Sequence, residues 1–139
     1  MTENAQRLRE FMEQVWNAGN VDAVDGFLAE RYTIFSDPGD RWDGQTLSRD
    51  GFKERLLISR APFPDLTFDI AEMISEGDRV AMSWTMRGTQ TGAMGDSPPS
   101  GRAIHAQGMT IYYFVDGRIA GHRQVVDRLT VGRQLGLAG

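Results

Sequence analysis

One carboxylate near the C-terminus has a setting suited to acid/base chemistry. The strand-like run from Ala120 ends at Asp127, and a short segment ending in Gln134-Leu135-Gly136 follows it. A carboxylate at the end of an aromatic-rich sheet can act as a general acid or base when an apolar cavity desolvates it and raises its pKa. Asp is also a common N-cap, and a helix that begins just after Asp127 would use its side chain in that way. The sequence leaves both roles open.

Strand periodicity decides which neighbours share a side with Asp127, because successive side chains of a strand point to opposite faces. Arg123 has the same parity as Asp127. It is either a surface arginine or a group that binds a carboxylate or enolate oxygen. His122 has the opposite parity, so we expect it to turn away from the pocket unless a β-bulge reverses its direction.

The preceding strand-like run, Ala103 to Val115, carries further candidates of one parity. These are His105, Gln107, Met109, Ile111 and Tyr113. Tyr113 is the second catalytic candidate, because its hydroxyl can polarise a ligand carbonyl. We expect His105 and Gln107 to bind a carbonyl at the pocket rim, or else to form a polar pair on an edge strand. Met109 and Ile111 would line the same pocket.

Aromatic side chains offer surfaces on which a flat polyphenolic or steroid-like ligand can stack. We take Trp16, Tyr32 and Trp42 as candidate substrate-binding residues. Trp84 is better explained as part of the core.

The composition argues against several classes of chemistry. The chain of 139 residues has no cysteine, which removes disulfides, thiolate nucleophiles and cysteine-based zinc sites. Its one lysine, Lys53, lies in a charged stretch running from Arg49 to Arg55 that is typical of a solvated helix face, so a Schiff-base mechanism is disfavoured. The two histidines are widely separated, and no metal-binding or nucleotide-binding motif is present. We therefore expect neither a metal nor a cofactor.

Charge and hydropathy indicate where the protein works. A net charge of −4 argues against nucleic-acid binding, which needs a basic surface. No apolar run approaches the roughly 20 residues that cross a bilayer. The first residues, MTENAQRLRE, lack a hydrophobic signal region. We expect a cytoplasmic protein that does not bind membranes.

The periodicity of apolar residues changes from helical to alternating along the chain. Helices are predicted first, and an antiparallel meander follows. The predicted helices are Leu8 to Trp16, Val24 to Leu28 and, after an N-cap at Ser48, Arg49 to Ser59. The predicted strands are Tyr32 to Phe35, Thr67 to Ser75, Arg79 to Thr91, Ala103 to Val115 and Arg118 to Asp127. This order indicates one α+β domain over residues 1–139, with a curved sheet, helices over one face and a pocket in the concavity.

A series of short motifs resembles one known family. In order, they are Phe63-Pro64-Asp65-Leu66, Glu76-Gly77-Asp78-Arg79-Val80, Gly88-Thr89, Pro98-Pro99-Ser100-Gly101-Arg102, Asp116-Gly117-Arg118-Ile119 and Asp127 through Gln134-Leu135-Gly136. The helix end at Trp16-Asn17-Ala18-Gly19-Asn20 adds to the series. The chain is similar to the SnoaL-like polyketide cyclases of the nuclear-transport-factor-2-like superfamily.

The resemblance implies a cone-shaped α+β domain whose N-terminal helices close a pocket lined by a mainly antiparallel sheet. It implies ring closure by an intramolecular aldol step without metal or cofactor, with a pocket aspartate as acid/base. Asp127 matches the position of that aspartate. Two features differ from the family: the strand before the Asp-Gly turn lacks the family's histidine over Thr110 to Phe114, and Arg123 stands where many relatives have tryptophan.

Three functions remain open at this point. The first is a cofactor-free cyclase or isomerase of a hydrophobic, carbonyl-bearing small molecule. The second is a hydrolase or lyase that uses the same pocket, and the third is a non-catalytic module that binds a small ligand. The resemblance also leads us to expect a homo-oligomer, either a dimer or a tetramer.

Overall fold

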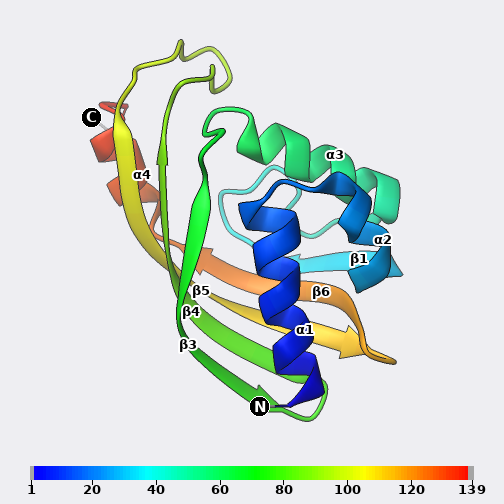
Figure 1. Ribbon diagram of the computed structural model, residues 1–139. Coiled ribbons are helices and arrows are strands. Elements are labelled where there is room, and N and C mark those ends of the chain that lie inside the picture. The colour runs from blue at the N-terminus through cyan, green and yellow to red at the C-terminus, as the bar shows by residue number, and fades with distance from the viewer. Residues whose placement is uncertain (1, 138–139) are drawn as a thin grey trace.

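The chain folds into one layer of helices on a six-stranded mixed sheet, as seen in a computed structural model that describes residues 2–137. The predicted domain of residues 1–139 includes three residues, 1, 138 and 139, that lie outside this described range. Figure 1 shows the long strands curving around the side on which α1, α2 and α3 lie. The α+β class and the cone-like architecture predicted from the sequence are confirmed.

The predicted helices are present, although the first begins at Glu3, five residues before the predicted Leu8. The helical elements are α1 (Glu3–Phe11), the π-helix η1 (Met12–Asn17), the 3-10 helix η2 (Val21–Ala23), α2 (Val24–Phe27), α3 (Arg49–Arg60) and α4 (Arg128–Gln134). Ser48 caps α3 as predicted, because its hydroxyl accepts a hydrogen bond from the backbone N–H of Gly51 at 3.0 Å. Within residues 2–137, no helix has the length and apolar character needed to cross a membrane.

Six strands form the sheet in the order β2-β1-β6-β5-β4-β3. Their bounds are β1 (Leu28–Ser36), β2 (Thr46–Ser48), β3 (Thr67–Glu76), β4 (Arg79–Thr89), β5 (Ala103–Val115) and β6 (Arg118–Val126). All neighbouring pairs are antiparallel except β1 and β6, which are parallel. The short strand β2 was not predicted, since three residues are too few for a periodicity to be recognised.

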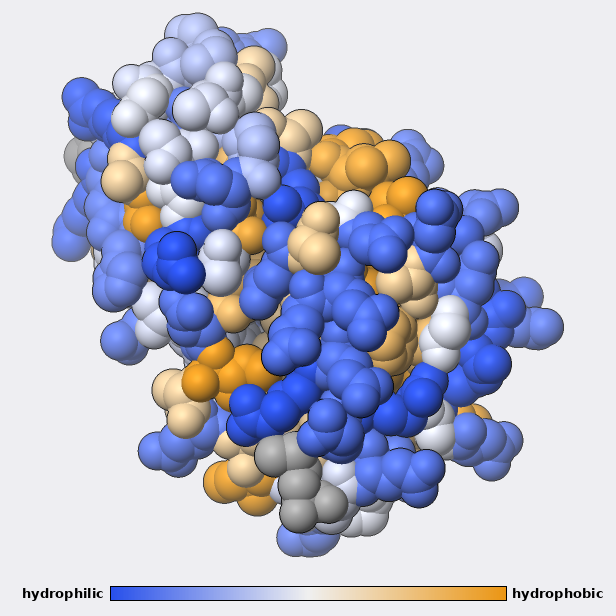
Figure 2. Space-filling view, viewed as in Figure 1, coloured by the Kyte–Doolittle hydropathy of each residue, from blue (hydrophilic) through white to orange (hydrophobic). Residues whose placement is uncertain are grey.

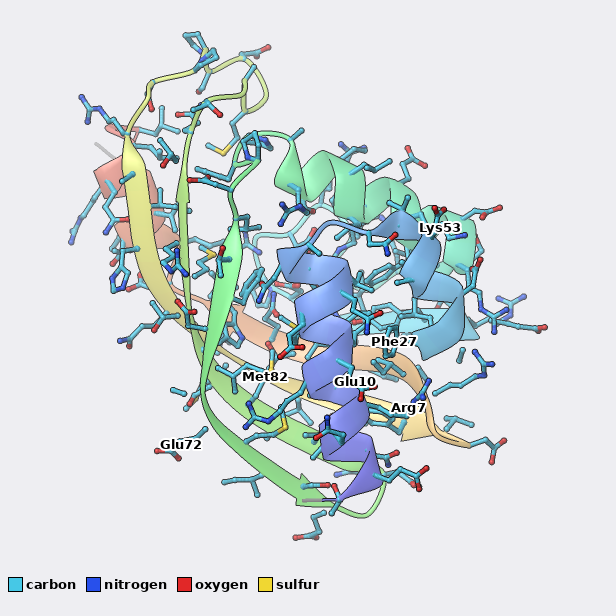
Figure 3. The ribbon with its side chains drawn as sticks, in the orientation of Figure 1. Arg7, Glu10, Phe27, Lys53, Glu72 and Met82 are labelled. Carbon is cyan, nitrogen blue, oxygen red and sulfur yellow. The ribbon has the colours of Figure 1, made fainter. Side chains whose placement is uncertain are left out.

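The core lies between the helices and the concave face of the sheet. The buried side chains of β5 are Ile104, Ala106, Thr110, Tyr112 and Phe114. Tyr112 and Phe114 belong to the same core cluster as Leu8 and Phe11 of α1 and Met12 and Val15 of η1. Met82 of β4 lies on this face behind α1 (Figure 3). The alternate residues of β5 therefore point to the convex face, which the described helices leave open.

The side of the molecule that carries the helices is mostly hydrophilic. Figure 2 shows blue side chains over most of this surface and an orange patch over α3. In that helix Leu57 is 58 % exposed and Ile58 is 37 % exposed. Ile58 also borders the cavity described next, so the apolar patch continues into the interior of the cone.

Candidate active site

A cavity of about 420 Å³ opens between α3, the upper part of the sheet and α4. Its volume falls within the range of small-molecule sites. The walls are mainly apolar, and all three tryptophans of the chain, Trp16, Trp42 and Trp84, contribute to them. Four charged or amide side chains interrupt the apolar lining: Asp40, Arg55, Gln124 and Arg128. Such a mixture suits a hydrophobic ligand with a few polar atoms.

The loop between β1 and β2 places two carboxylates beside this cavity. The backbone N–H of Asp37 donates to the carboxylate of Asp43 at 2.7 Å, and the N–H of Asp40 donates to the carbonyl of Asp37 at 3.0 Å. The carboxylate of Asp40 accepts a hydrogen bond from the backbone N–H of Trp42 at 3.1 Å. Together these three bonds, of which the last is an Asx turn, fold the loop back on itself. They hold Asp40 at the cavity wall and Asp37 in the interior.

Asp37 is fully buried and accepts hydrogen bonds from several side chains. Its Oδ2 lies 2.9 Å from His122 Nε2 and 3.1 Å from Gln124 Nε2. Its Oδ1 accepts from Arg128 Nη2 at 3.2 Å. The other ring nitrogen of His122, Nδ1, lies 2.5 Å from the hydroxyl of Tyr32. Both nitrogens of His122 are therefore bound to protein groups, which makes the imidazole a link between β6 and the loop.

Arg55 of α3 forms the second ion pair of the cluster. Its Nη2 donates to Asp40 Oδ2 at 2.7 Å and lies 3.4 Å from Asp37 Oδ2. The charged stretch containing Arg55 was predicted to be a solvated helix face, and this was wrong for Arg55, which is 4 % exposed. The residue stands three positions after Phe52 and next to Leu56, so it belongs to the buried stripe of α3.

Burial and neighbouring charges shift several pKa values in the cluster. Burial lowers the pKa of His122, against the opposing effect of Asp37, and so favours a neutral imidazole. Burial alone would raise the pKa of Asp40, but the charge and hydrogen bond of Arg55 lower it overall. Desolvation raises the pKa of both Tyr32 and Tyr112, so these phenols stay protonated. At neutral pH the wall of the main cavity thus carries a carboxylate at Asp40, and the histidine buried behind it, His122, is neutral.

His122 and Asp127 do point to opposite sides of the end of β6, as their parity predicted. The inward side, however, is that of His122, which is 2 % exposed, and the prediction that it turns away from the pocket was wrong. No bulge is needed for this, because the pairing of β5 and β6 is regular from Tyr112 opposite His122 to Gly108 opposite Val126. The parity argument was sound, but the choice of the inner face was not.

Residues with the parity of Asp127 or of Met109 lie on the convex face of the sheet. His105, Gln107, Met109 and Ile111 are exposed there. Arg123 is also exposed and donates from Nε to the hydroxyl of Tyr113 at 3.1 Å, while its guanidinium covers the ring of Phe35. None of these six predicted site residues lines the cavity of the cone. The sequence misled here because both faces of β5 carry apolar side chains.

Asp127 is the N-cap of α4, which matches the second of the two roles considered from the sequence. Its Oδ1 accepts from the backbone N–H of Thr130 at 3.1 Å, and its Oδ2 accepts from the hydroxyl of Thr130 at 2.6 Å. The hydrogen bonds from Thr130 lower the pKa of Asp127, and the side chain is exposed rather than desolvated. It borders a hollow on the convex side together with Gln107 and Met109.

Two of the three aromatic candidates, Trp16 and Trp42, are placed where a ligand in the cone would meet them, and Tyr32 is not. Trp16 and Trp42 line the main cavity. Trp84 belongs to the buried core, as predicted, and it also borders the cavity. Tyr32 is buried behind the cavity, against His122. Sequence reasoning missed Asp37, Asp40, Arg55, Gln124 and Arg128. The one available signal was the concentration of Asp and Gly in the polar loop after the first strand.

Comparison with known proteins adds an independent line of evidence. A model of the SnoaL-like polyketide cyclase family matches residues 6–135. A solved structure from Acidithiobacillus ferrooxidans, described as a candidate polyketide cyclase, is 40 % identical with a TM-score of 0.92, over 99 % of this chain and 97 % of that one. IdmH of Streptomyces antibioticus, also described as a candidate polyketide cyclase, is 26 % identical with a TM-score of 0.81, over 97 % and 99 % of the two chains.

The fold is also found in a protein with a different description. AclR of Streptomyces galilaeus, described as a candidate hydroxylase, has a TM-score of 0.81 at 20 % identity, over 99 % of this chain and 87 % of that one. A search of curated proteins gave no match to the sequence. The family match spans nearly the whole chain, and the cone-shaped fold is the one expected for that family. The chain therefore belongs to the family of SnoaL-like polyketide cyclases.

Proposed function

We propose that the protein is a cofactor-free acid/base catalyst that closes or isomerises a hydrophobic, carbonyl-bearing small molecule, with Asp40 as the acid/base group. One observation carries the proposal. The carboxylate of Asp40, paired with Arg55 at 2.7 Å, stands on the wall of a cavity that is otherwise mainly apolar. A charged pair at the edge of a ligand site is a common feature of catalytic sites.

The chemistry requires one group that takes and returns a proton. Asp40 would remove a proton from the carbon next to a carbonyl, and the electron pair would move onto the carbonyl oxygen to give an enolate. In a ring closure, the enolate carbon then bonds to a second carbonyl carbon of the same molecule. The resulting alkoxide would take the proton back from Asp40. The proton balance closes without any external acid, base or oxidant.

The surroundings of Asp40 define how it would act as a base. Arg55 lowers the pKa of Asp40, which keeps the carboxylate ionised at neutral pH but also makes it a weaker base, so removal of the α-proton needs an enolate that is stabilised by its neighbours. The three tryptophans of the cavity offer flat surfaces that would hold a planar ring system. Gln124 and Arg128, also in the wall, are positioned to bind further oxygen atoms of such a molecule.

The test is exchange of α-protons for deuterium in 2-tetralone, a bicyclic ketone, followed by proton NMR in D₂O. We expect the wild-type protein to accelerate the exchange and Asp40→Asn to lower the rate by about 10²-fold or more. Asp50→Asn is the matched control, since Asp50 has a side chain that is 96 % exposed on the same helix as Arg55. Full activity of a folded Asp40→Asn variant would exclude Asp40 as the base.

The same assay examines the role predicted for Asp127 and Tyr113 from the sequence. Asparagine can still cap α4, so Asp127→Asn removes the charge while preserving the helix end. A large loss of exchange in Asp127→Asn or Tyr113→Phe would place the chemistry on the convex side of the sheet. Binding of 2-tetralone without any exchange would favour the non-catalytic ligand-binding module over both catalytic proposals.

A homo-oligomer is also part of the proposal. The convex face of the sheet exposes several apolar side chains: Ile74 (67 %), Val125 (62 %), Met109 (61 %) and Ile111 (38 %). They come from three different strands and border one hollow. An exposed apolar surface on a sheet is a common site of association. A second copy of this chain, with the same surface, is the partner we propose.

A further inference from the structure

Arg55 has hydrogen-bond donors that the described part of the chain does not use. A guanidinium carries five N–H groups. Its Nη2 donates to Asp40 at 2.7 Å and reaches toward Asp37 at 3.4 Å. Its Nε is enclosed and has no acceptor, and no residue from 2 to 137 accepts a hydrogen bond from Nη1. Leaving donors of a buried cation without partners is costly, so the arrangement needs a physical reason.

The position of Arg55 suggests what completes its hydrogen bonding. The side chain, only 5 % exposed, lines the main cavity and also a smaller one of about 40 Å³ behind it. His122, Tyr112 and Gln124 line the smaller cavity too. Arg55 therefore stands in the wall between the apolar space for a ligand and the buried polar cluster, where an oxygen atom of a bound molecule can reach its guanidinium.

Aromatic rings fix the guanidinium in this place. Its Cζ lies 5.5 Å from the ring centre of Trp16, 5.8 Å from that of Trp42 and 5.9 Å from that of Phe52. These are cation–π distances, and such contacts are stronger where the cation is desolvated. Two of the rings, those of Trp16 and Trp42, also form walls of the main cavity. A ring system held between these walls would bring its edge toward Arg55.

The formal charges of the cluster indicate the kind of ligand. Arg55 and Arg128 carry two positive charges, and Asp37 and Asp40 carry two negative ones. A carboxylate or phosphate ligand would add a charge that this balance does not offset. A neutral ketone adds none, and it can accept a hydrogen bond through its oxygen. When a neighbouring base takes the α-proton, negative charge develops on that oxygen next to the cation.

We propose that Nη1 of Arg55 binds the carbonyl oxygen of a neutral, planar cyclic ketone and stabilises the enolate formed from it. The proposal rests on the proposed function, and it names the substrate class and the group that recognises it. In this role Arg55 touches the reacting oxygen, while Asp40 handles the proton.

The test measures binding rather than turnover, by quenching of tryptophan fluorescence, because all three tryptophans of the chain line the cavity. Three probes of similar size are compared: 2-tetralone, the hydrocarbon tetralin and the anion 2-naphthoate. We expect wild-type protein to bind 2-tetralone about tenfold more tightly than tetralin, as a hydrogen bond to a charged donor allows. It should bind 2-naphthoate more weakly than 2-tetralone. Tighter binding of the anion would overturn the assigned ligand class.

Arg55→Met keeps an unbranched apolar side chain of about the length of the arginine's aliphatic part and removes its donors. We expect this variant to bind 2-tetralone and tetralin equally. The control is Lys53→Met on the same helix, where Lys53 pairs with Asp25 at 3.0 Å near α2 and away from the cavity (Figure 3). It should keep the tenfold preference. An unchanged preference in folded Arg55→Met would show that Arg55 does not bind the oxygen.

A measurement on unmodified protein covers the case in which Arg55→Met fails to fold. The carbonyl carbon of ¹³C-labelled 2-tetralone should move downfield on binding to wild-type protein and less far in Arg55→Lys, which presents a single ammonium group. A carbonyl signal that does not move on binding to wild type would refute the proposal. If Asp40→Asn leaves the exchange rate unchanged while wild-type protein still prefers the ketone to tetralin, only the role of Asp40 fails. If Asp40→Asn lowers the exchange rate while wild-type protein shows no preference for the ketone, only the role of Arg55 fails.

Discussion

His122 Nε2 lies 2.9 Å from the carboxylate of Asp37, a residue 85 positions earlier in the chain. Both side chains are almost completely buried. The bond ties the parallel strands β1 and β6 together just beyond the point where β1 ends, and it orients the loop that carries Asp40. Because both ring nitrogens of His122 already have partners, we assign it a positioning role in the cluster.

The stability of the protein should fall as pH drops below about 6.5, the reference pKa of histidine. Burial lowers the pKa of His122 in the folded state, so between its folded pKa and about 6.5 the unfolded chain binds more protons. Stability then rises with pH through that window and is fully present above it. One additional proton bound by the unfolded chain changes the free energy of unfolding by at most about 1.4 kcal/mol per pH unit.

Urea unfolding between about pH 5 and pH 8 measures this dependence. In His122→Gln the slope near pH 6 should flatten, whereas in His105→Gln, which alters an exposed histidine, it should match wild type. An equal slope in wild type and His122→Gln would contradict the assignment.

Asp37→Asn should destabilise the fold by about 3–5 kcal/mol, the usual effect of removing one partner from a buried ionic network. The amide would present N–H groups to His122, Gln124 and Arg128, which already act as donors to Asp37. Asp69→Asn is the control, because Asp69 and Arg87 form an ion pair in which each side chain is 56 % exposed. Such pairs contribute less than about 1 kcal/mol. Urea unfolding curves of the two variants should therefore differ clearly, and similar curves would count against the network.

Gly108→Ala should destabilise the protein and disturb the cavity wall. A Cβ at Gly108 would lie 2.3 Å and 2.4 Å from ring atoms of Trp84, which is paired with it across the β4–β5 ladder. Overpacking of this kind costs about 1–3 kcal/mol. Gly26→Ala, where an added Cβ meets nothing within 4 Å, is the control. The free energy of unfolding is the measurement, and a Gly108→Ala protein as stable as Gly26→Ala would contradict the packing described.

Val125→Glu should convert an oligomer of the protein to monomer, because it places a charge in the apolar surface on the convex face of the sheet. Val125 is 62 % exposed in the single chain. The matched control is Leu57→Glu on α3, at an equally exposed position of 58 % on the other side of the molecule. Sedimentation velocity distinguishes the states. A wild-type protein that sediments as a monomer at all concentrations would refute the proposed association.

The order and type of the longer helices and strands follow from the sequence, whereas the three-residue strand β2 does not. Its helical spacing in Leu8 to Trp16 and Phe52 to Leu56, its N-cap at Ser48 and its hairpin turns are local signals, and the structure follows them. Hydrophobic periodicity also indicated that neighbouring residues of β6 point to opposite faces. These features depend on residues only a few positions apart, so they can be recognised without knowledge of the tertiary fold.

The inner face of the sheet is selected by packing in the folded chain, and the sequence does not indicate it. On β5, Tyr112 and Phe114 have one parity and Met109 and Ile111 the other, so either set suits a core. The packing of α1 and α3 selects the first set, and this choice turns His122 inward and leaves Asp127 as an exposed cap. The cluster of Asp37, Arg55 and His122 joins three distant segments. It forms because a buried charge must find partners, and only the folded chain brings those partners together.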